Sequence, residues 1–182
     1  MSREKLDKEG HEFYPNDENR YDGAPDDICL SITFPNAGLM YSFTQPGRLN
    51  EGKEWVVLEM DIDPLWAVGT RFCAVNAAKD SGLHICPGLA GFAKLFEENP
   101  PASSDARSYN HSVDCPTDIQ AEVLVKSEIS IDHLRRVCVR NEIVAIEVRK
   151  MLQNRPVDVI VNDRIFWSNK VREDMRNEGE RY

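Results

Sequence analysis

Residues 115–139 read CPTDIQAEVLVKSEISIDHLRRVCV, and this stretch is central to the fold class. Residues 120–126 predict a strand, because apolar and β-branched residues make up its centre. Ser130 predicts the N-cap of a short helical turn through residues 134–136, and residues 137–139 predict a short strand. Strands that are separated by turns and irregular segments, without regular βαβ alternation, favour an α+β protein.

The clearest helix signal follows this stretch, over residues 142–152. Apolar side chains recur there at helical spacing, and basic residues occupy the last turns, where cations complement the helix dipole. Pro156 ends the helix. Residues 157–161 predict a further strand, and residues 165–167 are expected to pair back onto it.

The half of the chain before this stretch predicts two more strands and two helices. Residues 28–34 and 55–62 are rich in β-forming residues, and the second strand is expected to be buried on both faces at its start. Residues 89–97 have apolar positions at helical spacing, and residues 3–9 fit a short helix. Residues 39–43 are compatible with a short strand or a turn of helix.

The length and composition favour one globular domain. The chain has 182 residues, of which 41% are hydrophobic and 29% charged, as in ordinary globular proteins. We expect a single domain over residues 1–168 and a charged, mobile tail over residues 169–182. The phosphate-binding patterns GxGxxG and GxxxxGK[ST] are absent, which argues against a doubly wound nucleotide-binding fold.

The charge and hydropathy patterns exclude some classes of protein. Lys and Arg number 22 and Asp and Glu number 31, so the formal net charge is −9. A protein that binds polyanions through bulk charge is disfavoured, although a local basic groove is still compatible with the sequence. No apolar run approaches the roughly 20 residues that span a bilayer. The polar opening MSREKLDKEG predicts no signal peptide.

The cysteines indicate a reducing compartment, so we expect a cytoplasmic protein. They number five, an odd count, and they are widely spaced. Several metal-binding residue types fall in one part of the chain, but no CxxC pair begins a zinc site. Scattered buried thiols are therefore the favoured interpretation, and no metal is expected. The residues considered are Cys73, His84, Cys86, His111 and Cys115.

Residues 100–118 and the following Glu122 form the first candidate site. The segment PPASSDARSYNHSVDCPTD has no periodicity, and a loop of this length in a compact domain is typically functional or disordered. Glu122 is among the first residues of the strand predicted directly after it, so its carboxylate could be held rigidly while substrates approach from the loop. The alternative is an edge strand with Glu122 and Lys126 on its solvent face.

Arg20 and His111 are weaker candidates. Arg20 in ENRYDGAPDD precedes a predicted strand and could clamp a phosphate or a carboxylate, or it could be a solvated loop residue. His111 could act as a base, or be an ordinary loop histidine. The basic residues of the C-terminal third fit either solvated helix faces or a polyanion groove.

Three segments together resemble the DarT family of toxins, which ADP-ribosylate bases of single-stranded DNA with NAD+. They are NRYDGAPDDICLSITFPNAGLMYSF at residues 19–43, WVVLEMDIDPLW at residues 55–66, and the stretch at residues 115–139. The QAEVLV strand is the most specific part, and the segment FPNxxxMY supports it. The resemblance extends from about residue 3 to residue 152.

The resemblance implies a fold, a cofactor and partners. The fold is an α+β, ADP-ribosyltransferase-like split β-sheet core with flanking helices, with NAD+ as co-substrate in a cleft. Glu122 matches the catalytic glutamate of the QAE motif, and Arg20 matches an arginine that assists catalysis and binds NAD+. Residues 100–118 match the target-selecting loop, including Tyr109, Asn110 and His111. Single-stranded DNA and a macrodomain-type antitoxin are the implied partners.

One departure from the family pattern concerns the start of the chain. The family opens with a strand that carries a His-Phe-Thr motif and contributes to NAD+ binding. The only early histidine here is His11 in GHEFY, which does not fit this motif. The resemblance therefore implies an N-terminally truncated chain. The alternative function is a catalytically silent remnant that binds nucleic acid or a protein partner.

Overall fold

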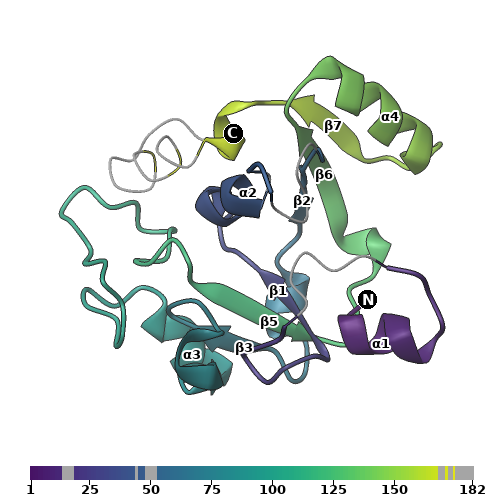
Figure 1. Ribbon diagram of the computed structural model, residues 1–182. Coiled ribbons are helices and arrows are strands. Elements are labelled where there is room, and N and C mark those ends of the chain that lie inside the picture. Colours follow the sequence, from purple (N-terminus) through teal and green to yellow (C-terminus); the bar gives the residue numbers. More distant parts are fainter. Residues whose placement is uncertain (14–18, 44, 48–52, 168–170, 172–173, 175–182) are drawn as a thin grey trace.

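The computed structural model describes residues 1–13, 19–43, 45–47, 53–167, 171 and 174. Figure 1 shows two β-sheets with helices packed around them. Sheet A has the order β1 (Asp27–Leu30), β5 (Glu122–Lys126), β3 (Arg71–Cys73) and β4 (Ile85–Pro87). Sheet B has the order β2 (Val56–Met60), β6 (Leu134–Val139) and β7 (Asp158–Val161). The expected α+β class, with a split β-sheet and flanking helices, is confirmed.

The register of sheet A fixes which side chains lie near Glu122. Strand β5 pairs with β1 on one side and with β3 on the other, and both pairings are antiparallel. Glu122 lies opposite Cys73, and Leu124 lies opposite Cys29. Because residues opposite each other in a ladder share a face, and residues two apart do as well, Glu122, Cys29 and Cys73 are on one face of the sheet.

The other face of sheet A is covered by α3 (Gly88–Lys94), as Figure 1 shows. The ring of Phe92 lies 5.5 Å from that of Phe72 in an edge-on arrangement and 5.3 Å from that of Phe96. Val123 belongs to the same buried cluster and is fully inaccessible. This core fixes the backbone of β5 beside Glu122, since packed interiors leave little room for movement.

Sheet B contains one βαβ unit, formed by β6, α4 (Glu142–Leu152) and the parallel strand β7. Asn141 caps α4, because its Oδ1 accepts a hydrogen bond at 3.1 Å from a backbone N–H of the first turn. Ala145 packs against Val137 and Val139 of β6. The helix has the bounds that its sequence pattern predicts.

Strand β2 differs from its prediction. The expected strand at residues 55–62 is shorter, and Val56 and Leu58 are 37% and 56% exposed. Among the described residues β2 lies at an edge of sheet B, where one side of the strand meets solvent. The prediction of burial on both faces is therefore wrong.

Residues 165–167 also differ from their prediction, because they do not pair as a strand. Residues Arg164–Phe166 form a 3-10 turn, η4, that places Ile165 and Phe166 against Cys138 of sheet B. A helical turn, and not a strand, buries the side chains of Ile165 and Phe166. The expectation that this segment pairs back is wrong.

Two short helices lie near the start of the chain. Helix α1 (Arg3–Lys8) agrees with the predicted short helix, and Ser2 caps it. Helix α2 (Ala37–Phe43) resolves the ambiguity at residues 39–43 in favour of a helix. No helix in the described residues is both long and apolar enough to cross a membrane.

The expected domain limits stay predictions. In the segment 169–182 the structure describes Val171 and Asp174, and both are buried. Val171 packs against Phe34 and Ala37, and Asp174 forms an ion pair with Arg164.

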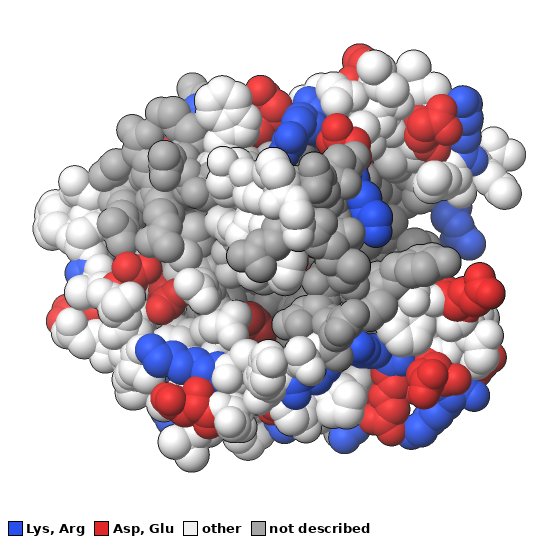
Figure 2. Space-filling model, viewed as in Figure 1, with Lys and Arg blue, Asp and Glu red and all other residues white. Residues whose placement is uncertain are grey.

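Charges of both signs are interspersed on the surface. Figure 2 shows Lys and Arg among Asp and Glu on the visible face, without a continuous basic area.

Candidate active site

Glu122 is the first residue of β5 and is partly buried. Its Oε1 accepts a hydrogen bond from Nδ2 of Asn76 at 3.0 Å. Asn76 follows β3, the strand that pairs with β5 at Cys73. The carboxylate therefore points across sheet A to a neighbouring segment, and the alternative of a fully solvated edge-strand glutamate is wrong.

The surroundings of Glu122 shift its pKa. Burial raises the pKa of the Glu122 carboxyl above its ordinary value, because desolvation disfavours the charged form. Hydrogen bonds from the Cys29 thiol and the Ala77 backbone oppose this shift, and so does the charge of Arg20, while Asp22 adds to it. The site therefore holds a carboxylate whose pKa is raised by burial and which accepts several hydrogen bonds.

Cys29 is the partner of Glu122 in this thiol–carboxylate contact. Its thiol pKa is strongly raised by burial and by the nearby Glu122 charge. The side chain nevertheless reaches solvent, so the thiol lies on an accessible part of the sheet A face. Glu122 and Cys29 thus meet at one accessible surface between β1 and β5.

Arg20 holds together the segment that precedes β1. Its Nε and NH2 donate to the two carboxylate oxygens of Asp22 at 3.0 and 2.6 Å. The guanidinium also donates to the carbonyl oxygens of Ala24 and Asp27 at 2.6 and 3.1 Å. The hydrogen bond with Asp22 raises the pKa of Arg20. Most donors of Arg20 are therefore used inside the protein, so it is not a solvated loop residue.

Residues 100–118 form an irregular but internally bonded loop. Arg107 donates to the carbonyl oxygens of Cys115 and Ser112 at 3.0 and 2.6 Å, and to Oγ1 of Thr117 at 3.2 Å. Thr117 in turn bonds to the carbonyl oxygen of Glu97 at 2.6 Å. The loop is thus tied to itself and to the end of the α3 segment.

The three expected target-selecting residues lie in different environments. Tyr109 is fully exposed, and Asn110 is exposed beside it. His111 is buried, and its Nε2 lies 3.0 Å from the carbonyl oxygen of Pro116. The loop therefore presents an aromatic ring and an amide to solvent, while the histidine is part of the loop's own structure.

Sequence reasoning missed Asn76 and Cys29 as neighbours of Glu122. Asn76 is separated from Glu122 by 46 positions, and no motif marks it. The pairing of β3 with β5 brings the two together. A sequence alone does not give the register of strands so far apart.

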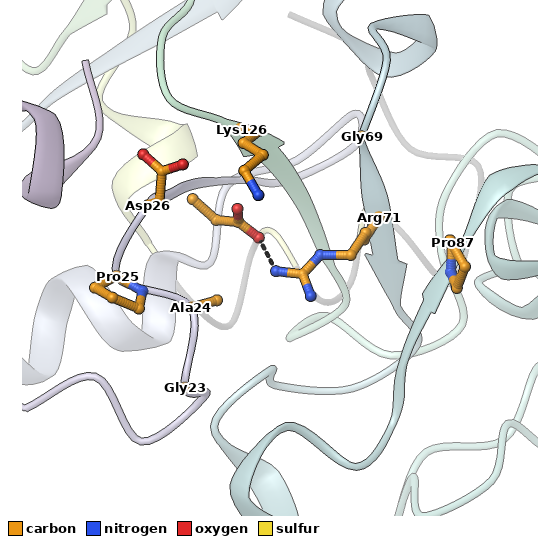
Figure 3. Close-up of a pocket in the computed structure, with 9 residues that line it drawn as sticks. Gly23, Ala24, Pro25, Asp26, Gly69, Arg71, Pro87 and Lys126 are labelled. Carbon is orange, nitrogen blue, oxygen red and sulfur yellow. Dashed lines mark hydrogen bonds and ion pairs between the residues drawn. The ribbon is translucent and has the colours of Figure 1, made fainter.

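A separate cavity of about 460 Å³ lies elsewhere on sheet A (Figure 3). Arg71 forms an ion pair with Asp27 there, and Lys126 lies near them. Glu122 does not line the cavity, because Lys126 and Glu122 occupy opposite ends of β5, roughly 13 Å apart at 3.3 Å per residue. The lining residues are Gly23, Ala24, Pro25, Asp26, Asp27, Gly69, Arg71, Pro87 and Lys126.

Asp61, Asp63 and His133 gather near sheet B, with ligand atoms within 4.8 Å of one another. Asp61 already accepts from His133 at 3.0 Å and from Arg135 at 2.6 Å. These cationic or donor groups satisfy its carboxylate, so the cluster is explained without a cation.

The two sheets carry Glu122, a hydrogen-bonded carboxylate, at the start of a central antiparallel strand, and the class of protein, an ADP-ribosyltransferase, is given by the family match. The family model described as "ssDNA thymidine ADP-ribosyltransferase, DarT" matches residues 34–167, which is most of the chain, and the chain belongs to this family.

Solved structures of this family share the fold. Thermus sp. 2.9 DarT in complex with NAD+ gives a TM-score of 0.60 at 15% identity, covering 92% of this chain and 87% of that chain. The same protein in complex with ADP-ribosylated ssDNA gives 0.54 at 13% identity, covering 78% and 69%. Thermosipho africanus DarTG in complex with ADP-ribose gives 0.57 at 14% identity, covering 91% and 46%. Comparison with curated protein sequences gives no significant match.

Proposed function

We propose that this chain transfers ADP-ribose from NAD+ to thymidine in single-stranded DNA, with Glu122 as the catalytic carboxylate. The observation that carries this proposal is the position of Glu122. It lies at the start of β5, after the internally hydrogen-bonded loop of residues 100–118, and it accepts a hydrogen bond from Asn76. Family membership supplies the reaction and the class of substrate.

The reaction breaks the bond between C1′ of the ribose and the nicotinamide nitrogen. The electron pair of that bond leaves with nicotinamide, and C1′ gains positive charge. A carboxylate fixed near the ribose stabilises this charge and orients a ribose hydroxyl. A nitrogen of the thymine ring then forms a bond to C1′ with its electron pair, and the proton of that nitrogen passes to water. Glu122 performs the stabilising step in this proposal, which requires it to be ionised when NAD+ is bound.

The loop of residues 100–118 receives the DNA. A base must leave its stack before C1′ can reach it, which favours single strands. Tyr109 is fully exposed and offers a ring on which the base or its neighbour stacks, and Asn110 offers an amide for hydrogen bonds. His111 is assigned to holding the loop, in agreement with its burial and its contact with Pro116.

Arg20 acts in this proposal from the segment in front of β1. Its positive charge influences both Glu122 and Cys29. It therefore favours the ionised carboxylate and supplies a cationic surface for NAD+, a dinucleotide with a diphosphate.

The biological setting follows from the family. We assign the chain to a toxin whose product is removed by a macrodomain-type antitoxin, and to the cytoplasm. The neighbour Thermosipho africanus DarTG is in complex with ADP-ribose, and this chain covers 46% of that chain. The five free thiols fit a reducing compartment.

The test is transfer to oligonucleotides by the full chain. We incubate it with NAD+ and with thymidine-containing or thymidine-free single strands, and weigh the products. Glu122→Ala is expected to lower transfer by about 100-fold or more, as loss of a transition-state group does. Glu147→Gln, an exposed glutamate paired with Lys150 on α4, is the matched control and keeps the wild-type rate. Full transfer by Glu122→Ala would contradict the assignment, and absence of transfer by the wild-type chain would favour the silent remnant.

A further inference from the structure

Asn76 makes a direct contact with the proposed catalytic carboxylate. It follows β3, whose last residue, Cys73, lies opposite Glu122 in the sheet. Its Nδ2 donates to Oε1 of Glu122 at 3.0 Å. An amide N–H donates to an ionised carboxylate more strongly than to the neutral acid, so the contact favours the ionised form.

The amide of Asn76 is itself held in one orientation. Its Oδ1 accepts from the backbone N–H of Ala78 at 3.0 Å, and its carbonyl oxygen accepts from the N–H of Lys79 at 3.0 Å. The neighbouring residues Val75 and Ala77 are almost fully buried. Because Oδ1 is used in the turn, Nδ2 points toward Glu122 without a free choice of rotamer.

The other groups that face Glu122 do not replace this donor. Asp22 is negatively charged, as Glu122 is. Most N–H donors of Arg20 bond to Asp22 and to backbone carbonyl oxygens. Cys29 and Cys73 are thiols with raised pKa values, caused first by burial, so they stay neutral. The Cys29 thiol and the Ala77 backbone N–H also donate to the carboxylate, and Asn76 is the amide donor whose orientation is fixed by a turn.

We propose that Asn76 is a positioning residue that holds Oε1 of the Glu122 carboxylate and so fixes the orientation in which this carboxylate meets the ribose of NAD+. This inference rests on the proposed role of Glu122. Asn76 acts through Glu122, and it lowers the pH below which the enzyme loses activity. Loss of its hydrogen bond lowers kcat more than it raises KM for NAD+.

The competing explanation is that Asn76 only shapes the turn after β3. Two substitutions separate the roles. Asn76→Ala removes the turn acceptor and the donor to Glu122 together. Asn76→Asp keeps an oxygen for the Ala78 N–H, but it replaces the donor with a like charge. Asn162→Ala is the matched control, because Asn162 makes the same type of turn bond to the Arg164 N–H, at 3.1 Å, on the other sheet.

The experiment is a pH–rate profile of ADP-ribose transfer by the full chain with NAD+ and a thymidine oligonucleotide, together with thermal unfolding. We expect Asn76→Ala to lower kcat by about 10- to 100-fold, as for a hydrogen bond to a charged group, with KM for NAD+ changed by less than about threefold. The acid limb of the profile moves to higher pH, and it moves furthest, by about one pH unit or more, in Asn76→Asp. Asn162→Ala leaves rate and profile unchanged.

Two results separate failure of this inference from failure of the proposed function. If Glu122→Ala is inactive while both Asn76 variants are folded and keep the wild-type acid limb, Asn76 only shapes the turn and the inference is overturned. If Glu122→Ala retains full activity, the proposed function itself fails. If Asn76→Ala does not fold, Asn76→Asp, which keeps the turn bond, decides the question.

Discussion

Folding partly buries the Glu122 carboxylate, so its charge is less well solvated than in the unfolded chain. Burial raises its pKa above the ordinary 4.5, and the hydrogen bonds around it offset only part of that rise. A folded state that binds a proton more tightly than the unfolded state loses stability as the pH rises through this window. Ionised Glu122 therefore lowers the stability of the fold at neutral pH, while the proposed reaction requires it.

Glu122→Gln is accordingly expected to stabilise the protein at pH 7 while abolishing transfer. The melting temperature rises by about 2–4 °C for each kcal/mol that is relieved. The gain shrinks as the pH falls toward the ordinary glutamate pKa, because the wild-type carboxyl becomes neutral too. Thermal unfolding from pH 4 to pH 8 measures this, with exposed Glu147→Gln as control. A gain that grows toward low pH would contradict the assigned pKa direction.

Arg20 gives a second prediction at this scale. Asp22 is buried, with 8% of its surface exposed, and Arg20 holds both of its oxygens. Arg20→Ala leaves this charge without its partner, so we expect a loss of about 3–5 kcal/mol in the free energy of unfolding. Denaturant unfolding measures the loss, and the double variant with Asp22→Asn recovers part of it. A loss below about 1 kcal/mol would return Arg20 to the role of a solvated residue.

At the scale of elements, the segment of residues 100–118 is a loop with an internal frame. Arg107 supplies this frame through hydrogen bonds to Ser112, Cys115 and Thr117. Tyr109 is fully exposed to solvent. A loop with a rigid frame and an exposed tip suits the positioning of a target. The tip is accessible to the target without refolding of the loop on binding.

Arg107→Ala is therefore expected to loosen this loop more than it destabilises the fold. Loss of three hydrogen bonds from a charged donor costs about 1–3 kcal/mol locally. Amide hydrogen exchange in residues 108–117 speeds up, and the KM for the oligonucleotide rises more than the KM for NAD+. Arg149→Ala, on the surface of α4 and paired with Glu142, is the matched control. Unchanged exchange in the loop would exclude the framing role.

At the scale of the whole molecule, the net charge of −9 opposes the approach of DNA. Figure 2 shows positive and negative side chains interspersed on the visible face. Under the proposed function, single-stranded DNA would therefore be held through a few local contacts, such as stacking on Tyr109, more than through a basic groove.

The affinity for single-stranded DNA is consequently expected to depend weakly on salt. For contacts to one or two phosphates, the slope of log affinity against log salt is about −0.7 to −1.4. Fluorescence anisotropy with a labelled thymidine oligonucleotide, from 50 to 300 mM NaCl, measures this slope. Tyr109→Ala lowers the affinity without changing the slope. A slope steeper than about −4 would show that a basic groove contacts several phosphates, which contradicts the prediction.

The sequence by itself predicts several of the local elements, and it singles out Glu122 as the carboxylate of the candidate site. The helix over residues 142–152 has its predicted bounds, because its apolar stripe, its basic last turns and Pro156 are all local signals. The apolar centre of residues 120–126 predicts a strand, which the structure has as β5 from Glu122 to Lys126, and the lack of periodicity predicts the irregular loop before it. Glu122 lies where the loop and the strand meet.

Tertiary structure alone decided which side chains surround that carboxylate. Asn76 meets Glu122 only because β3 pairs with β5 in one register, over a separation of 46 positions. The exposure of β2 depends on its place at the edge of sheet B, and the engagement of Arg20 depends on how the segment before β1 folds back on itself. Periodicity and capping act within a few residues, whereas strand order and register come from packing between distant segments.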